Sequence, residues 1–305
     1  MTTESLRKQL GGMPLFEAAR VAGVKFTKEA LPEDKYVQVG KIRMHYLDWG
    51  NHGKPKYLLL HGGAQTAHMW DFFALAMRDN YHIVALDQRG HGDTDWVDDG
   101  DYSAEAHVED IKGFTDKIGF DTFNLQGLSM GGRNSYGFAA KHPQKVKALV
   151  IVDVGPDIQV EGRKRIQEFL EDTEVFESFD WLVERVKRYN PFRDERQIRG
   201  SLVNNLKQLP DGRWTWKHDR RRGIRRDRGG EFMANAWEDV KAVKAPTLIA
   251  RGAQSDIFTV TTAKKMLSII PGSKMVEIPK AGHLVPGDNP VVFEKAVREF
   301  LKGVP

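Results

Sequence analysis

Residues 122–143 carry the most informative local pattern in the chain and read TFNLQGLSMGGRNSYGFAAKHP. Residues 122–125 favour a strand, and 131–142 favour a helix that ends at the following proline. Between them, Gly127–Gly131 reads G-L-S-M-G, in which glycines leave room for a sharp strand-to-helix turn. Such a turn strains the backbone of its serine and projects the hydroxyl above the sheet edge. We therefore predict Ser129 as a nucleophile, with a mere tight turn as the alternative.

Apolar strands alternate with amphipathic helices on both sides of this motif. The alternation predicts an α/β fold, a mainly parallel sheet with helices on both faces. The expected strands are 36–39, 42–47, 57–60, 82–86, 122–125, 147–152, 246–251 and 274–278, and the expected helices are 66–77, 103–118, 131–142, 261–270 and 291–301.

One long segment interrupts the alternation. Residues 157–235 are rich in Arg and Glu and contain helical patches without a parallel-strand run. We predict that they form a helical cap inserted into an α/β core made of 35–156 and 236–305. Residues 1–34 are expected to form an N-terminal arm that packs on the rest of the chain or contributes to a homodimer.

The composition places the protein among ordinary globular chains. It has 305 residues, 40% hydrophobic and 29% charged, which excludes a disordered chain, a collagen and a coiled coil. It contains no cysteine, which excludes disulfides, thiolate nucleophiles, zinc–thiolate sites and iron–sulfur clusters and fits a reducing compartment. Apolar runs such as Ala148–Val152 are too short to span a bilayer, and the first residues lack the pattern of a signal peptide. We expect a soluble, cytoplasmic protein that does not engage a membrane.

The net charge of +4 hides a strong asymmetry along the chain. Arg185–Arg228 holds 15 basic and 5 acidic residues, a net charge of +10, while the rest sums to −6. Six arginines gather between Arg220 and Arg228. We expect these arginines to have one of three roles: to form a solvated face of the cap, to attract an anionic substrate, or to bind an acidic partner. Nucleic acid is not expected as a partner, because no base-reading motif accompanies the charge.

A serine nucleophile requires a base and an acid from elsewhere in the chain. His283 follows the expected strand 274–278 and therefore lies at the carboxyl edge of the sheet, where catalytic groups of open α/β sheets gather. Asp256 follows strand 246–251 at the same edge, and Asp153 follows the neighbouring strand. We predict Asp256 as the residue that orients His283, with Asp153 as the alternative.

Two backbone N–H groups should stabilise the oxyanion of an acyl-transfer reaction. One is expected from Met130, which follows the nucleophile. The other is expected from Gly63 in the loop after strand 57–60, with Ala64 as the second choice.

Taken together, these motifs resemble the α/β-hydrolase superfamily, in its branch with a helical cap. The resemblance covers about residues 35–304 and rests on HGG at 61–63, DQRGHG at 87–92, GLSMGG at 127–132, the loop Gly252–Asp256, and AGHLVP at 281–286. It implies a triad in the chain order Ser129, Asp256, His283. Family members that dehalogenate or open epoxides carry aspartate at the elbow, so the serine here argues against both reactions.

The resemblance implies a serine carboxylesterase that works through an acyl-enzyme, without cofactor or metal. The expected partner is a small soluble ester, with an anionic ester as the specific hypothesis. Thioesters, lactones, carbon–carbon bonds and perhydrolysis remain alternatives, as does a ligand receptor that keeps the pocket without turnover. Aromatic residues of the cap could line the pocket, although most are expected to form the cap's own core; they are Phe169, Phe179, Trp181, Tyr189, Phe192, Trp214 and Trp216.

Overall fold

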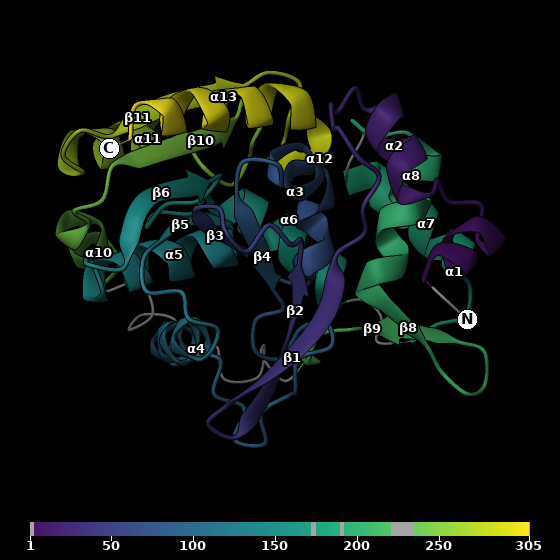
Figure 1. Ribbon diagram of the computed structural model, residues 1–305. Coiled ribbons are helices and arrows are strands. Elements are labelled where there is room, and N and C mark those ends of the chain that lie inside the picture. The colour runs from purple at the N-terminus through teal and green to yellow at the C-terminus, as the bar shows by residue number, and fades with distance from the viewer. Residues whose placement is uncertain (1–2, 172–174, 190–191, 221–234, 305) are drawn as a thin grey trace.

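The structure, a computed structural model, describes residues 3–171, 175–189, 192–220 and 235–304. Its centre is an eight-stranded sheet in the order β1-β2-β4-β3-β5-β6-β10-β11 (Figure 1). β1 and β2 are antiparallel to their neighbours, and the strands from β4 to β11 run parallel. The strands are β1 (Glu33–Val39), β2 (Ile42–Asp48), β3 (Lys56–Leu60), β4 (His82–Leu86), β5 (Phe123–Leu128), β6 (Val146–Val152), β10 (Thr247–Gly252) and β11 (Lys274–Ile278). The predicted α/β fold is confirmed.

Apolar cores lie on both faces of this sheet. Because successive side chains of a strand point to opposite faces, Leu59 belongs to one core and Leu60 to the other. Helices α3, α12 and α13 border the first core, and α4, α5, α10 and α11 border the second. The helices outside the insertion are α1 (Thr3–Gln9), α2 (Leu15–Val21), the 3₁₀ helix η1 (Ala67–Trp70), α3 (Asp71–Met77), α4 (Ala104–Lys117), α5 (Met130–Lys141), α10 (Ala236–Ala242), α11 (Val260–Ile269), α12 (Val285–Asp288) and α13 (Pro290–Lys302).

The segment between β6 and α10 contains more strand than we expected. Its elements are α6 (Val160–Glu171), β7 (Val175–Phe176), α7 (Phe179–Tyr189), α8 (Glu195–Leu202), η2 (Val203–Asn205), β8 (Leu206–Gln208) and β9 (Trp214–Trp216). β9 pairs antiparallel with β7 and with β8, so a small three-stranded sheet stands beside the helices. This small sheet was not predicted alongside the helices of the cap, because strands of two or three residues leave almost no periodic signal. The division into arm, core and cap stays a prediction.

The N-terminal arm packs against this insertion within the same chain. Figure 1 shows α1 and α2 beside α7 and α8. Arg7 is buried; its Nε donates to the Gly200 carbonyl at 3.1 Å and its Nη2 to Asn204 Oδ1 at 3.0 Å. Its guanidinium also lies 3.8 Å from Asp71 of α3. One side chain thus joins arm, insertion and core.

The turn after β4 holds a buried ionic pair. His45 donates from Nδ1 to Asp87 Oδ2 at 2.7 Å and from Nε2 to Asp34 Oδ1 at 3.1 Å. Burial alone would lower the pKa of His45, but the two carboxylates outweigh it and raise the pKa to about 9. Since an unfolded histidine titrates near pH 6.5, this pair contributes stability that is fully present below about pH 6.5 and is lost as the pH rises through about 9.

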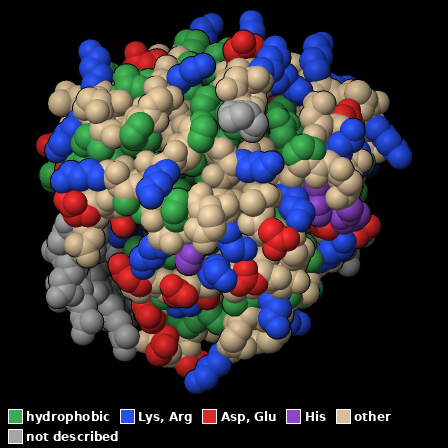
Figure 2. All heavy atoms as spheres, turned by 60° about the vertical axis from the view of Figure 1, so that its left-hand side comes forward, with side chains coloured by type: hydrophobic (Ala, Val, Ile, Leu, Met, Phe, Trp, Pro, Cys, Tyr) green, Lys and Arg blue, Asp and Glu red, His purple; other side chains and the backbone are tan. Residues whose placement is uncertain are grey.

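The surface carries charges of both signs. On the face shown in Figure 2, Lys and Arg side chains stand among Asp and Glu side chains. The described residues include Arg220. The other five arginines of the cluster, Arg221, Arg222, Arg225, Arg226 and Arg228, lie outside them. No helix in the described ranges is both long and apolar enough to cross a bilayer.

Candidate active site

Ser129 occupies the sharp turn predicted from its motif. β5 ends at Leu128 and α5 begins at Met130, and Ser129 between them has φ 53° and ψ −117°. Its N–H donates to the Val152 carbonyl at 3.0 Å, which fixes the turn against the end of β6. A Cβ on Gly131 would stand 2.3 Å from the carbonyl oxygen of Leu60, so the helix can approach the sheet only without that side chain. The backbone strain is held by this close packing and leaves Ser129 part-exposed at the sheet edge.

His283 meets a buried carboxylate at this edge. Its Nδ1 donates to Asp153 Oδ2 at 2.8 Å, and the Asp153 side chain is wholly buried while His283 keeps 15% exposure. Because Asp153 accepts this bond, the proton sits on Nδ1 and Nε2 is left as the basic nitrogen. This is the tautomer that a general base at this position would need.

Two further donors hold Asp153 in place. The Gly252 N–H donates to Oδ1 at 2.9 Å, and the Ser255 hydroxyl donates to Oδ2 at 2.5 Å. Asp153 itself adopts φ 50° at the end of β6, next to the carbonyl that binds the Ser129 N–H. Hydrogen bonds from Gly252, Ser255 and His283 thus converge on the Asp153 carboxylate and fix its orientation.

The pairing expected between Asp256 and His283 is wrong. Asp256 points to the insertion instead, where its Oδ2 lies 2.9 Å from Arg165 Nη1, and both side chains are well exposed. Gly162 of α6 packs closely on the Asp256 carbonyl: a Cβ added to Gly162 would lie only 2.3 Å from that oxygen. The structure therefore gives the carboxylate position to Asp153, the alternative weighed from the sequence. The donors Gly252 and Ser255 were not predicted as part of the site, although both lie in the loop Gly252–Asp256 that the resemblance had singled out.

The expected oxyanion donors lie around Ser129. Met130 is the first residue of α5, so its N–H belongs to the helix N-terminus directly after the nucleophile. On the other side, the ideal Cβ position of Gly62 lies 3.5 Å from the Ser129 Cβ, and Gly63 follows with an exposed backbone. Ala64, the second choice, has φ 61° in the same turn. The roles of Gly63 and Met130 stay predictions.

The insertion contacts the loop that carries His283. Arg193 Nε lies 3.3 Å from Asp288 Oδ1, and Asp288 Oδ2 accepts the Gly282 N–H at 3.0 Å. The ring of Phe192 lies 3.1 Å from the position a Gly282 Cβ would take. Phe192 is therefore the cap aromatic with a described contact to this loop.

The other cap aromatics divide between core and surface. Phe179, Trp214 and Trp216 are buried in the insertion's own apolar cluster, and Trp181 is exposed. The side chains of Phe169 and Tyr189 lie outside the described residues.

The fold and this site define a hydrolase of the α/β type. The chain matches the α/β hydrolase fold family over residues 58–290, and it belongs to this family. It is 31% identical to the esterase Rv0045c of Mycobacterium tuberculosis, over 95% of this chain and 94% of that protein. The crystal structure of that esterase matches with a TM-score of 0.76 and 29% identity, covering 94% of this chain and 96% of that one. The chain is also 27% identical to the 2-(acetamidomethylene)succinate hydrolase of Mesorhizobium japonicum, over 87% of this chain and 94% of that protein.

Proposed function

We propose that the protein is a serine esterase that cleaves carboxylic esters of small substrates through an acyl-enzyme. The observation that carries the proposal is the 2.8 Å hydrogen bond between His283 Nδ1 and the buried Asp153, beside the strained turn of Ser129. Similarity to the mycobacterial esterase supports the ester as the bond that is cleaved.

The proposed reaction has two half-reactions. His283 Nε2 takes the proton of Ser129 as the hydroxyl oxygen attacks the ester carbonyl. The N–H groups of Gly63 and Met130 donate to the oxyanion, for which a single donor contributes about 2.7–4 kcal/mol. His283 then protonates the leaving alcohol, and water repeats the sequence on the acyl-enzyme. Asp153 stabilises the imidazolium in both steps and stays ionised.

A covalent probe tests the nucleophile. A fluorophosphonate should label Ser129 in the wild-type protein and leave Ser129→Ala unlabelled, while kcat falls by roughly 10⁴-fold or more because the triad acts as a unit. Ser268→Ala is the matched control, since this exposed serine of α11 donates its hydroxyl to the Lys265 carbonyl of the same helix. Labelling at another serine, or activity above a tenth of wild type in Ser129→Ala, would contradict the assignment.

The competing reactions separate in one substrate screen. p-Nitrophenyl esters of increasing chain length are compared with lactones and thioesters at equal concentration. We expect the highest kcat/KM on short to medium acyl esters, without a jump above the solubility limit. A receptor that only binds ligand would give at most one slow turnover per protein molecule.

We further propose that the preferred ester is anionic, such as a monoester of a dicarboxylic acid. The net charge of +10 between Arg185 and Arg228 supports this, as does the similarity to a succinate-derivative hydrolase. Charges of this kind raise the local concentration of an anion over roughly 8–10 Å at ordinary salt. The kcat/KM for the anionic ester should exceed that of a neutral ester of equal length and fall as salt rises. Equal, salt-independent values would leave the arginines as solvated surface.

Assembly and location stay predictions. Light scattering after size exclusion will decide between monomer and homodimer, and the arm packs within its own chain in the structure. The cytoplasm remains the expected compartment of a chain without cysteine.

A further inference from the structure

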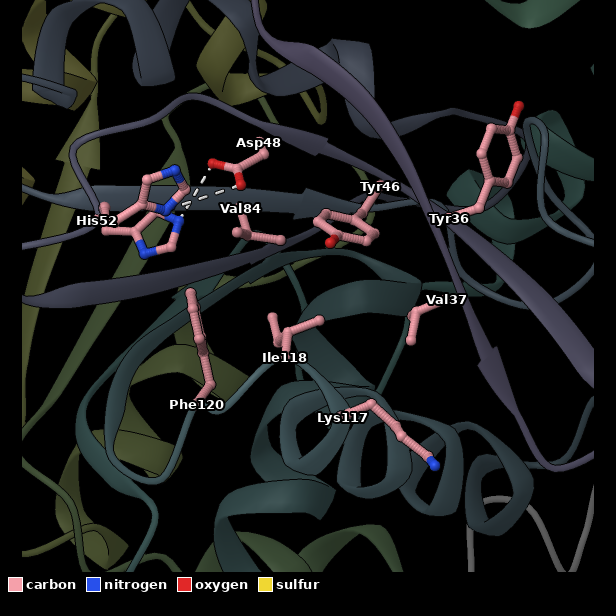
Figure 3. Close-up of a pocket in the computed structure, with 10 residues that line it drawn as sticks. Tyr36, Val37, Tyr46, Asp48, His52, Val84, Lys117, Ile118 and Phe120 are labelled. Carbon is pink, nitrogen blue, oxygen red and sulfur yellow. Dashed lines mark hydrogen bonds and ion pairs between the residues drawn. The ribbon is translucent and has the colours of Figure 1, made fainter.

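A pocket lies at the opposite end of the sheet from Ser129. It has a volume of about 260 Å³ and opens between β1, β2 and the end of α4 (Figure 3). His82 is the first residue of β4, whereas the residues of the candidate active site follow the last residues of the parallel strands. A strand of five residues rises about 3.3 Å per residue, so the two sites lie on opposite edges of the sheet.

Polar groups gather at one end of this pocket. Figure 3 shows the Asp48 carboxylate and the His52 imidazole facing one another, above Phe120 and Ile118 and away from Lys117. His82 Nε2 lies 3.1 Å from Asp48 Oδ1, and His52 Nδ1 lies 4.0 Å from Asp48 Oδ2. The rings of the two histidines meet edge to face with their centroids 4.5 Å apart.

These three side chains match the ligand set of a transition-metal ion. One atom from each lies within 4.8 Å of the others. In a tetrahedral zinc site with metal–ligand bonds of about 2.0–2.1 Å, neighbouring ligand atoms lie about 3.3 Å apart. The 3.1 Å between His82 Nε2 and Asp48 Oδ1 already fits this spacing, whereas His52 Nδ1 lies 4.0 Å from the other oxygen, Oδ2, and has to move closer. The His52 side chain is 65% exposed in the turn after β2, so its rotamer can adjust.

We propose that Asp48, His52 and His82 form a binding site for a divalent first-row transition metal such as Zn²⁺. Two imidazoles and one carboxylate suit zinc, cobalt or nickel, whereas calcium and magnesium prefer oxygen ligands. The pocket beside the three residues supplies room for a water as the fourth ligand. A bound ion would join β2, β4 and the turn between β2 and β3, at a distance from the ester-cleaving residues.

A second histidine–carboxylate group in the chain lacks these properties. His45, Asp87 and Asp93 also bring three ligand atoms together. Both ring nitrogens of His45 are bonded to carboxylates, and Asp87 accepts the backbone N–H groups of Ala67 and Asp93. Asp48 also accepts hydrogen bonds, from His82, from Lys35 and from the Gly50 N–H at 2.9 Å. The difference lies in the histidines: His52 is 65% exposed in a turn, whereas an ion at His45 would have to displace a carboxylate from each bonded ring nitrogen. The proposal therefore concerns the Asp48 group alone.

Lys35 is the natural competitor of a metal at this site. Its ammonium lies 2.8 Å from Asp48 Oδ2 and already offsets the carboxylate charge. If the three residues serve only as an ion-pair network, removal of this ammonium brings no cation in its place. If they bind a metal, removal of the ammonium frees a ligand oxygen and strengthens binding.

The test is titration of untagged, chelator-treated full-length protein with Zn²⁺ by calorimetry, with Co²⁺ absorption as a second readout. Wild type should bind an ion whose affinity falls at least tenfold in His52→Ala and in His82→Gln. His142→Gln, at the end of α5, should bind as wild type does. Lys35→Met should bind more tightly than wild type. Thermal melts without metal confirm that each variant is folded, and the exposed His52 keeps the test valid if the buried His82 variant unfolds.

Three results would overturn the proposal. They are no binding to wild type, binding as tight as wild type in both histidine variants, or no gain in Lys35→Met. Binding that disappears in His283→Gln but survives in His82→Gln would place the ion at the ester-cleaving residues instead, and would also refute the site. None of these outcomes bears on the proposed esterase activity, which is measured separately on metal-free protein.

Discussion

Asp153→Asn should lower kcat by roughly 10⁴-fold, because the surrounding hydrogen bonds force the amide into one unfavourable orientation. The Gly252 N–H at Oδ1 can only donate, so an amide nitrogen placed there would face another donor. Leaving that donor pair buried costs about 1–3 kcal/mol. The amide nitrogen therefore takes the Oδ2 position and donates to His283 Nδ1. The proton of the ring then moves to Nε2, which can no longer act as a base.

The matched control is Asp256→Asn. Its ion pair with Arg165 joins two well-exposed side chains and contributes about 0–1 kcal/mol to stability. We expect kcat within about fivefold of wild type for this variant, since Asp256 is paired with Arg165 whereas His283 is bonded to Asp153. A loss of 10⁴ in Asp153→Asn equals about 5.5 kcal/mol of transition-state stabilisation.

The assay measures kcat and KM on a short p-nitrophenyl ester, with the burst of p-nitrophenol to count active sites. Thermal melts by circular dichroism establish that both variants are folded. A larger loss in Asp256→Asn than in Asp153→Asn would refute the assignment of the carboxylate. So would retention of more than a tenth of wild-type kcat in a folded Asp153→Asn protein.

Three further changes test the fold around the site. His45→Gln should lower the free energy of unfolding by about 3 kcal/mol at pH 6 but by much less at pH 10, because the pKa of His45 in the folded protein is about 9. Chemical denaturation at both pH values measures this, and an equal loss at both would contradict the ion pair. Arg7→Ala should expose the insertion to limited proteolysis, since the Gly200 carbonyl loses its donor; an unchanged digestion rate would show that the arm does not hold the insertion. Gly131→Ala should abolish soluble folded protein. Gly137→Ala in the same helix should fold, because a Cβ there would meet ordinary contacts from 3.5 Å outward. Equal yields of soluble protein from the two variants would refute the close-packing argument.

The nucleophile and the base could be predicted because their signals are local. The elbow around Ser129 combines a strand end, glycines and a helix start within a few residues, and the backbone angles of Ser129 follow from that combination. His283 follows a recognisable strand at the correct edge of the sheet. The main sheet could be predicted for the same reason, because β3, β4 and β6 are short, largely apolar runs with clear limits.

The carboxylate could not be predicted, because the choice depends on contacts between neighbouring strands. β6 and β10 pair in parallel, so the residues after both strands reach the same side of the sheet. What decides between them is the φ of 50° at Asp153 and the donors Gly252 and Ser255, which lie about a hundred residues further along the chain. The chain order Ser, Asp, His is met by both Asp153 and Asp256, so it cannot decide between them. The sheet of the insertion was missed for a related reason, since β9 acquires its strand character from partners elsewhere in the chain.

The position of Arg7 has a consequence for how the protein is made. Its partner Asn204 follows 197 residues later, so the arm leaves the ribosome long before the surface that receives it. At about 5–20 residues per second, that interval is about 10–40 s. During this time the apolar side of α1 has no docking surface from the insertion, and a binding factor near the ribosome exit would find it accessible. Attaching a fusion partner to the C-terminus leaves this order of events unchanged, whereas a rapidly folding partner at the N-terminus would tether the arm during those seconds.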